Sequence, residues 1–150
     1  MNGIGYHDHN WKVKTAAVLN YGWFWGKINS NNFTIIWATI FKTRFLGQPL
    51  LVINKKDQDY INIEPENIQF AAKDIYIKNG KEIPHSFIIT AQDENISIHV
   101  AMDVQKTHHV KMLLIMNYWR FHVKCKGSIT IENREERIDE THIAEFLRFG

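Results

Sequence analysis

A run of six side chains of five chemical kinds, Tyr6 to Trp11, lies near the start of the chain. It holds a phenol, two imidazoles, a carboxylate, an amide and an indole, supplied by Tyr6, His7, Asp8, His9, Asn10 and Trp11. Nearly every position can exchange a proton or form a hydrogen bond, whereas an ordinary strand combines β-branched and aromatic residues with bland polar ones. Clustered titratable groups often mark functional sites, so this run is a candidate reactive or ligand-orienting site. The alternative is a buried polar network that fixes the first strand.

Strand geometry would divide the run between two faces. Side chains of a strand alternate with period two, which separates Tyr6, Asp8 and Asn10 from His7, His9 and Trp11. Either face could be the functional one. Burial would raise the pKa of Asp8 and a cationic histidine would lower it, and the sequence leaves both possibilities open.

This run resembles a known signature. Gly3-x-Gly5 followed by Tyr6 to Trp11, and then by Trp23-Phe24-Trp25-Gly26, resembles the motif of the hydroxyneurosporene synthase (carotenoid 1,2-hydratase) family. It is also similar to AttH-like, lipocalin-related proteins, which include fungal cyclases that act on polyene products. The resemblance implies two lipocalin-like β-barrel domains, with this motif opening the second one.

The chemistry that the resemblance implies is acid-initiated hydration or cyclisation of an apolar, unsaturated molecule. Asp8 would be the proton donor, and desolvation would keep it protonated near neutral pH. The candidate catalytic residues are therefore Asp8, Tyr6, His7 and His9. The candidate ligand-binding residues are Trp11, Trp23, Trp25 and Trp37, whose aromatic faces could stabilise a carbocation, and Glu145, which stands at a recurrent acidic position of the family.

The chain departs from the family in two ways. Lys12 stands where the family has glycine after the tryptophan, and 150 residues match only one of the two domains. If the site needs both domains, this protein could be a ligand-binding relic, could complete its site by pairing with a second chain or a partner lipocalin-like domain, or could be a fragment. A non-catalytic barrel that binds a lipid or another hydrophobic molecule is therefore the main alternative to an enzyme.

A metal site is the third possibility, although we expect no cofactor. His7 and His9 would share one strand face, and a third ligand would have to come from His99, His122 or Glu145. A metal site needs three or four converging ligands, and the two histidines alone do not supply them.

The composition bounds the class of protein. With 45% hydrophobic and 23% charged residues, the chain is typical of a globular domain, and we expect one domain over residues 1–150. A net charge of +2 is too small to indicate nucleic-acid binding. No apolar run has the length of a membrane span, and no apolar segment of a signal peptide follows Met1. The lone Cys125 excludes an internal disulfide framework and favours a cytoplasmic protein.

The patterning predicts an all-β, antiparallel, up-and-down barrel, which the family resemblance makes lipocalin-like. Alternating segments predict strands at 23–28, 33–43, 50–55, 60–63, 68–78, 81–90, 96–102, 110–116, 119–126 and 128–132. Asn79-Gly80 is typical of a two-residue hairpin. About eight strands can close around one small ligand, and the expected partner is accordingly a hydrophobic small molecule.

Three further expectations concern the second half of the chain. The segment 106–109 is predicted to be a solvated loop, and Gly127 a turn. In Trp119 to Lys126, the side chains of Trp119, Phe121, Val123 and Cys125 should face inward, which makes Cys125 a small buried residue. The segment 138–149 reads as a short helix from the spacing of its apolar residues, or as a last strand from the resemblance.

Overall fold

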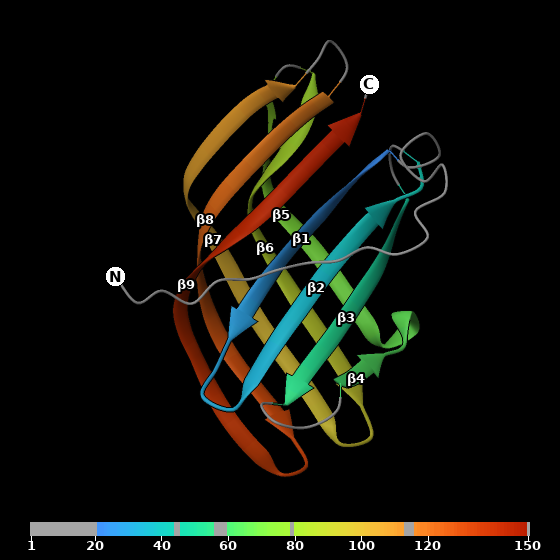
Figure 1. The fold of residues 1–150 in the computed structure, drawn as a ribbon, viewed down its shortest axis with the longest axis vertical. Helices are drawn as coiled ribbons and strands as arrows, with labels where there is room; N and C mark the ends of the chain where they lie inside the picture. Colours follow the sequence, from blue (N-terminus) through green and yellow to red (C-terminus); the bar gives the residue numbers. More distant parts are fainter. Residues whose placement is uncertain (1–20, 44–45, 56–59, 79, 113–115, 150) are drawn as a thin grey trace.

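Nine β-strands make up most of the part of the chain that the structure describes (Figure 1). The computed structural model describes residues 21–43, 46–55, 60–78, 80–112 and 116–149. The strands are β1 (Gly22–Asn29), β2 (Phe33–Phe41), β3 (Gly47–Lys55), β4 (Tyr60–Ile63), β5 (Ile68–Lys78), β6 (Lys81–Asp93), β7 (Ile96–Met112), β8 (Met116–Ile131) and β9 (Arg134–Phe149). A single 3-10 turn, η1 (Pro65–Asn67), joins β4 to β5. No helix within these residues has the length and apolar character needed to span a membrane.

All nine strands belong to one antiparallel sheet, in the order β4-β3-β2-β1-β9-β8-β7-β6-β5. Most pairs are neighbours in sequence, and the exception is β1 with β9, which are matched from Gly22↔Arg148 to Gly26↔Ala144. The sheet coils until β5 contacts β3 (Figure 1). This architecture confirms the predicted all-β, lipocalin-like barrel.

Alternation along each strand directs one set of side chains into the barrel. On β8 the predicted inward set is confirmed, because Trp119, Phe121, Val123 and Cys125 are all buried. Burial, with a further contribution from the Glu140 carboxylate, raises the pKa of the Cys125 thiol to about 12. A thiol with so high a pKa carries almost no thiolate at neutral pH, so Cys125 acts as a small core residue and not as a nucleophile.

Aromatic rings fill the centre of the barrel. The Phe24 ring of β1 lies edge-on to five other rings, with centroid distances between 4.8 Å (Phe87) and 5.9 Å (Phe121). The remaining three are Trp37, Phe70 and Phe146. Edge-to-face pairs of this kind add about 0.5–1.5 kcal/mol each beyond the area that they bury. The cluster joins six strands, so it stabilises the barrel as a whole.

The predicted loop at residues 106–109 is wrong. These residues belong to β7, which pairs with β8 along its whole length and shifts register between Val104 and Lys106. The register shift is a β-bulge, and a bulge exchanges the faces to which the following residues point. Val104, before the bulge, faces inward. His109 lies five residues later, so in a regular strand it would face outward, but after the bulge it also faces inward. The sequence therefore shows no single alternating pattern across this strand.

The predicted turn at Gly127 is also wrong, because Gly127 lies inside β8. A Cβ atom at this position would stand 1.9 Å from the carbonyl oxygen of His99 on β7. Glycine therefore permits a close approach of two strands and does not end one. The segment 138–149 is a strand and not a helix, because β9 pairs with β1 on one side and with β8 on the other.

His142 should make the stability of the barrel depend on pH. The backbone N–H of Asn29, at the end of β1, donates to His142 Nε2 at 3.2 Å. Burial lowers the pKa of His142 from its usual 6.5, although the nearby Glu140 carboxylate, 3.0 Å from the same nitrogen, opposes the shift and Lys27 assists it. A neutral ring can accept the Asn29 hydrogen bond, and a protonated Nε2 cannot.

Protonation of His142 should lower the stability of the barrel as the pH falls. When the folded pKa lies below the unfolded one, the unfolded chain binds more protons between the two values, so stability falls as pH decreases. We expect the contribution of His142 to be fully present above about pH 6.5 and to be lost as the pH falls through the folded pKa. Urea unfolding at pH 7.5 and pH 5.0 measures this loss, which should be smaller in a His142→Gln variant. Equal losses in the two proteins would contradict the assignment.

Candidate ligand-binding site

Polar side chains inside the barrel gather at one end, where β1 begins and β9 ends. We call this the polar end, and it comprises seven inward side chains: Thr39, Phe41, His109, Asn117, Trp119, Phe146 and Arg148. Strand register arranges them in two layers. The outer layer runs Phe41–Gly22–Arg148–Asn117, and the inner layer runs Thr39–Phe24–Phe146–Trp119–His109. The opposite end of the barrel is aliphatic, with Ile28, Ile35, Ile53, Ile98, Ile131 and Ile138 buried.

Arg148 is the charged member of the polar end and is only 9% exposed. Its Cζ atom lies 4.1 Å from the centroid of the Phe41 ring and 5.6 Å from that of Phe146. The guanidinium group thus rests on an aromatic face, an arrangement that attracts a cation more strongly when water is excluded. The inward position follows from alternation on β9, where Ala144, Phe146 and Arg148 point the same way.

His109, Asn117 and Trp119 form the second polar group of this end. The His109 ring stacks on the Trp119 indole, with 4.7 Å between centroids and 15° between planes. His109 Nε2 lies 3.1 Å from Asn117 Oδ1, and since an amide oxygen only accepts, the imidazole N–H donates. This hydrogen bond helps to hold the imidazole against the indole face.

Three buried polar atoms near this end have no hydrogen-bond partner among the described residues. They are Trp37 Nε1, Thr39 Oγ1 and Trp119 Nε1. Thr39 and Trp119 belong to the inner layer, and Trp37 lies one inward position below Thr39 on β2. Most buried polar groups in proteins are paired, so each exception needs a physical explanation. A ligand that carries hydrogen-bond acceptors is one such explanation.

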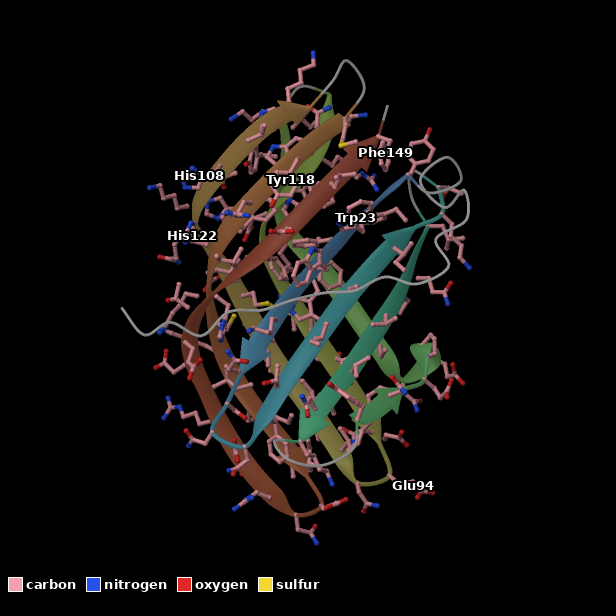
Figure 2. All side chains as sticks on the ribbon, in the orientation of Figure 1. Trp23, Glu94, His108, Tyr118, His122 and Phe149 are labelled. Carbon is pink, nitrogen blue, oxygen red and sulfur yellow. The ribbon has the colours of Figure 1, made fainter. Side chains whose placement is uncertain are left out.

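A separate polar cluster lies on the outer face of β1, β8 and β9. Trp25 Nε1 donates to Glu145 Oε2 at 3.1 Å, and Arg120 Nη2 donates to Glu145 Oε1 at 3.3 Å. Burial and a hydrogen bond to Glu145 raise the pKa of Tyr118. Trp23 extends this face toward the C-terminus, where its ring meets the edge of Phe149, 6.2 Å away between centroids (Figure 2).

The structure thus divides the predicted ligand-binding residues between two faces of the sheet. Trp37 points into the barrel, whereas Trp23, Trp25 and Glu145 lie outside it, so these four do not converge on one interior pocket. Trp23 and Trp25 share a face, as alternation along the predicted strand 23–28 requires, but that face is the outer one. The remaining predicted site residues lie outside the described part of the chain: Tyr6, His7, Asp8, His9 and Trp11.

The histidines proposed as additional metal ligands do not gather. His99 is opposite Ser128 on β8, and Glu145 is opposite Arg120, eight residues away along the same strand. His122 stands at the edge of a second imidazole, His108, 5.6 Å away between centroids. Within the described ranges, no group of three or more His, Cys, Asp or Glu side chains is placed to hold a metal ion.

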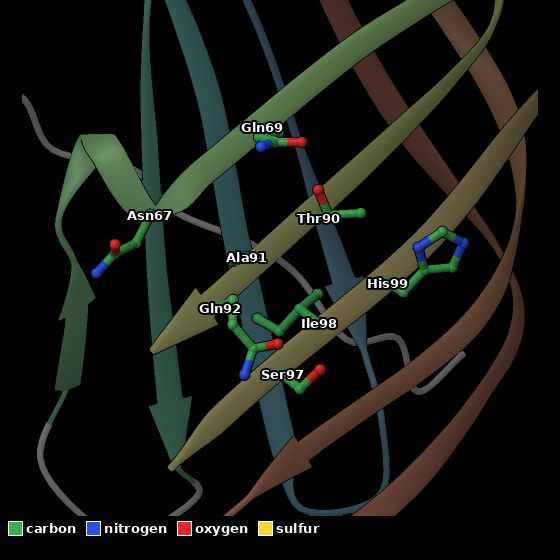
Figure 3. A pocket seen from close by; sticks show the side chains of 8 residues that line it. All are labelled: Asn67, Gln69, Thr90, Ala91, Gln92, Ser97, Ile98 and His99. Carbon is green, nitrogen blue, oxygen red and sulfur yellow. The ribbon is translucent and has the colours of Figure 1, made fainter. Parts of the chain in front are cut away.

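A hollow of about 300 Å³ lies against β5, β6 and β7 (Figure 3). Uncharged amide and hydroxyl groups and one imidazole line most of it, from Asn67, Gln69, Thr90, Gln92, Ser97 and His99. These polar side chains are exposed or half-exposed. The hollow is therefore separate from the polar end, and it lacks the aromatic surface found there.

Sequence reasoning missed the polar residues of this site: Thr39, His109, Asn117 and Arg148. A signal was present for three of them, because the alternation of the predicted strand 33–43 puts Thr39 on the same face as Trp37. Extending the alternation of Trp119 to Cys125 backward by one step places Asn117 inward, and extending Ala144 and Phe146 forward places Arg148 inward. His109 could not be found in this way, because the bulge on β7 intervenes.

No protein-family model matches the chain, and no curated protein matches it. Among solved structures, the fold is similar to a crystal structure of a protein from Nitrosomonas europaea that carries the provisional name AttH, with a TM-score of 0.61 and 9% sequence identity. The match covers 87% of this chain and 39% of that chain, so this chain spans about two fifths of that protein's length. At this identity the likeness concerns the fold alone. The described barrel therefore has an AttH-like fold.

Proposed function

We propose that this protein binds an apolar small molecule at the polar end of its barrel. The observation that carries the proposal is that two buried polar atoms of this end, Thr39 Oγ1 and Trp119 Nε1, have no partners among the described residues. Leaving such groups without a hydrogen bond costs about 1–3 kcal/mol each. A bound molecule that accepts hydrogen bonds from them would remove that cost.

The surroundings of these groups favour an apolar ligand. Small-molecule sites are mostly apolar, with a few polar groups that fix orientation. The polar end has this composition, because Phe41, Trp119 and Phe146 supply aromatic surface beside Thr39 and the His109–Asn117 pair. The lipocalin-like fold supports the same proposal, since small barrels of this kind enclose single ligands.

The position of the ligand is limited by the aromatic centre. Phe24 and the five rings around it occupy the middle of the barrel. A ligand therefore lies between the inner layer and the end of the barrel, against Phe41 and Trp119. It does not extend along the whole barrel axis.

Titration with N-phenyl-1-naphthylamine, a neutral probe that fluoresces in apolar surroundings, tests the proposal. We expect saturable binding with one site per chain. Phe41→Ala removes aromatic surface from the rim and should weaken binding about 5–30-fold, the equivalent of about 1–2 kcal/mol.

The control for this experiment is Ile40→Ala, because Ile40 directly precedes Phe41 on β2, points outward and is exposed. Its affinity for the probe should stay within about twofold of the original. Absence of saturable binding to the unaltered protein, or an equal loss in both variants, would contradict the proposal. Circular dichroism at the assay temperature verifies that both variants are folded.

The acid-initiated reaction implied by the N-terminal motif remains a separate proposal. It assigns proton donation to Asp8, with Tyr6, His7 and His9 beside it, and it rests on the motif alone. Turnover of a polyene substrate that survives in an Asp8→Asn variant would exclude this mechanism. A second barrel, from a partner or from another copy of the chain, is part of the same proposal.

A further inference from the structure

The charge of the polar end points to the class of ligand. Arg148 is the charged residue among the side chains that the structure describes as buried. A buried cation is unfavourable unless its surroundings stabilise it. The Phe41 and Phe146 rings stabilise the face of the guanidinium group, at 4.1 Å and 5.6 Å from Cζ.

The geometry of the guanidinium group allows a second interaction in its own plane. Stacking uses the flat face, whereas the five N–H donors lie along the edge, where they match the two oxygens of a carboxylate. A group with five donors can bind a carboxylate together with other partners. The position and the charge of Arg148 therefore suit the binding of a carboxylate at this end.

The neighbouring groups offer hydrogen-bond donors to the same ligand. Trp119 Nε1 is a donor only, and the Thr39 hydroxyl can donate; both are buried without a partner in the described part of the chain. Arg148 stands directly opposite Asn117 in the β8–β9 register. Thr39 and Trp119 lie one layer deeper, on either side of Phe24 and Phe146. Positive charge and donors thus meet above an aromatic layer.

From this arrangement we infer that the ligand is an apolar carboxylic acid in its ionised form, held by Arg148 at the polar end. The carboxylate oxygens accept from the guanidinium group and from Thr39 and Trp119, and the apolar part of the molecule contacts the aromatic rings. This inference rests on the proposed function and adds the head group that the site selects.

Competition between an acid and its neutral ester tests the inference. Dodecanoic acid and methyl dodecanoate have the same tail, and each is titrated against bound N-phenyl-1-naphthylamine at pH 7.5 and low salt. The unaltered protein should bind the acid at least about tenfold more tightly than the ester. This comparison needs no variant, so it stands even if substitutions at Arg148 impair folding.

Arg148→Met keeps an unbranched side chain over Phe41 and removes the charge. It should weaken binding of the acid about tenfold or more and change binding of the ester less than about twofold. Arg148→Lys keeps the charge but lacks the planar guanidinium group, so its affinity for the acid should lie between those of the unaltered protein and Arg148→Met. Arg134→Met is the control, because Arg134 is an exposed arginine at the opposite end of the same strand, and both affinities should be unchanged.

Three results of these titrations would each contradict a different statement. Equal affinity for acid and ester in the unaltered protein would overturn the carboxylate assignment and leave apolar binding in place. A preference for the acid that survives in Arg148→Met would overturn the role of Arg148. If the probe itself does not bind, the proposed function fails and the inference fails with it.

Discussion

Replacing Phe24 by alanine should lower the free energy of unfolding by about 3–5 kcal/mol. The Phe24 side chain is 1% exposed and contacts the rings Trp37, Phe70, Phe87, Phe121 and Phe146. These rings come from five other strands, so no single neighbour can move into the space left by Phe24. The loss therefore includes both the buried ring and a cavity in the centre of the barrel.

Urea unfolding followed by tryptophan fluorescence measures this loss. Phe149→Ala is the control, because Phe149 is half-buried on the outer face and Trp23 is its one aromatic partner among the described residues. It should cost about 1 kcal/mol or less. Phe24→Leu, which keeps much of the volume, should cost about 1–2 kcal/mol and remains measurable if the alanine variant is too unstable. A loss for Phe24→Ala no larger than that for Phe149→Ala would show that the cluster does not stabilise the barrel.

Replacing Gly26 by alanine should lower the free energy of unfolding by about 1–3 kcal/mol, although alanine is the smallest possible addition. The new Cβ atom would stand 2.6 Å from Cζ2 and 2.9 Å from Cε2 of Trp37, the residue opposite Gly26 on β2. The indole is buried in the aromatic centre, where it stacks on Phe70, so it cannot move aside without disturbing the core. Gly26 thus makes room for a side chain of the neighbouring strand.

A double-mutant cycle with Trp37→Phe separates this steric effect from backbone effects of alanine. Phenylalanine lacks the fused ring system that contributes the Cζ2 and Cε2 contacts. In the Trp37→Phe background, Gly26→Ala should therefore cost less than about 0.5 kcal/mol, measured by the same urea unfolding. An unchanged cost would mean that strand backbone, and not the indole, excludes a side chain at position 26.

The alternating patterns predicted which residues share a face, and most of these groupings are correct. Trp119, Phe121, Val123 and Cys125 are inward together, and Trp23 and Trp25 are together on one side of β1. Period two cannot state which of two mixed faces is buried when both carry aromatic residues. Trp23 and Trp25 lie outside because β1 pairs with β2 and β9 in a register that places Phe24 at the centre.

The predicted turn and loop were wrong because two long strands include these segments. Gly127 and the polar residues 106–109 are typical of turns, but they lie within β7 and β8, which pair over most of their length. Ladder hydrogen bonds and inward side chains outweigh weak local preferences. The β-bulge after Val104 hid the continuity of β7, since it reverses the faces and interrupts the alternation.

The sequence by itself determined the all-β class, the hairpin order, the buried state of Cys125 and the AttH-like resemblance, because these depend on local periodicity and on a contiguous motif. The polar end was decided by tertiary structure alone. Its members come from β2, β7, β8 and β9, and they meet because β1 pairs with β9, which joins the first and the last strand of the described chain within one sheet. No pattern along the chain encodes that closure, so Arg148, Asn117 and Thr39 become neighbours of one aromatic layer only in the folded barrel.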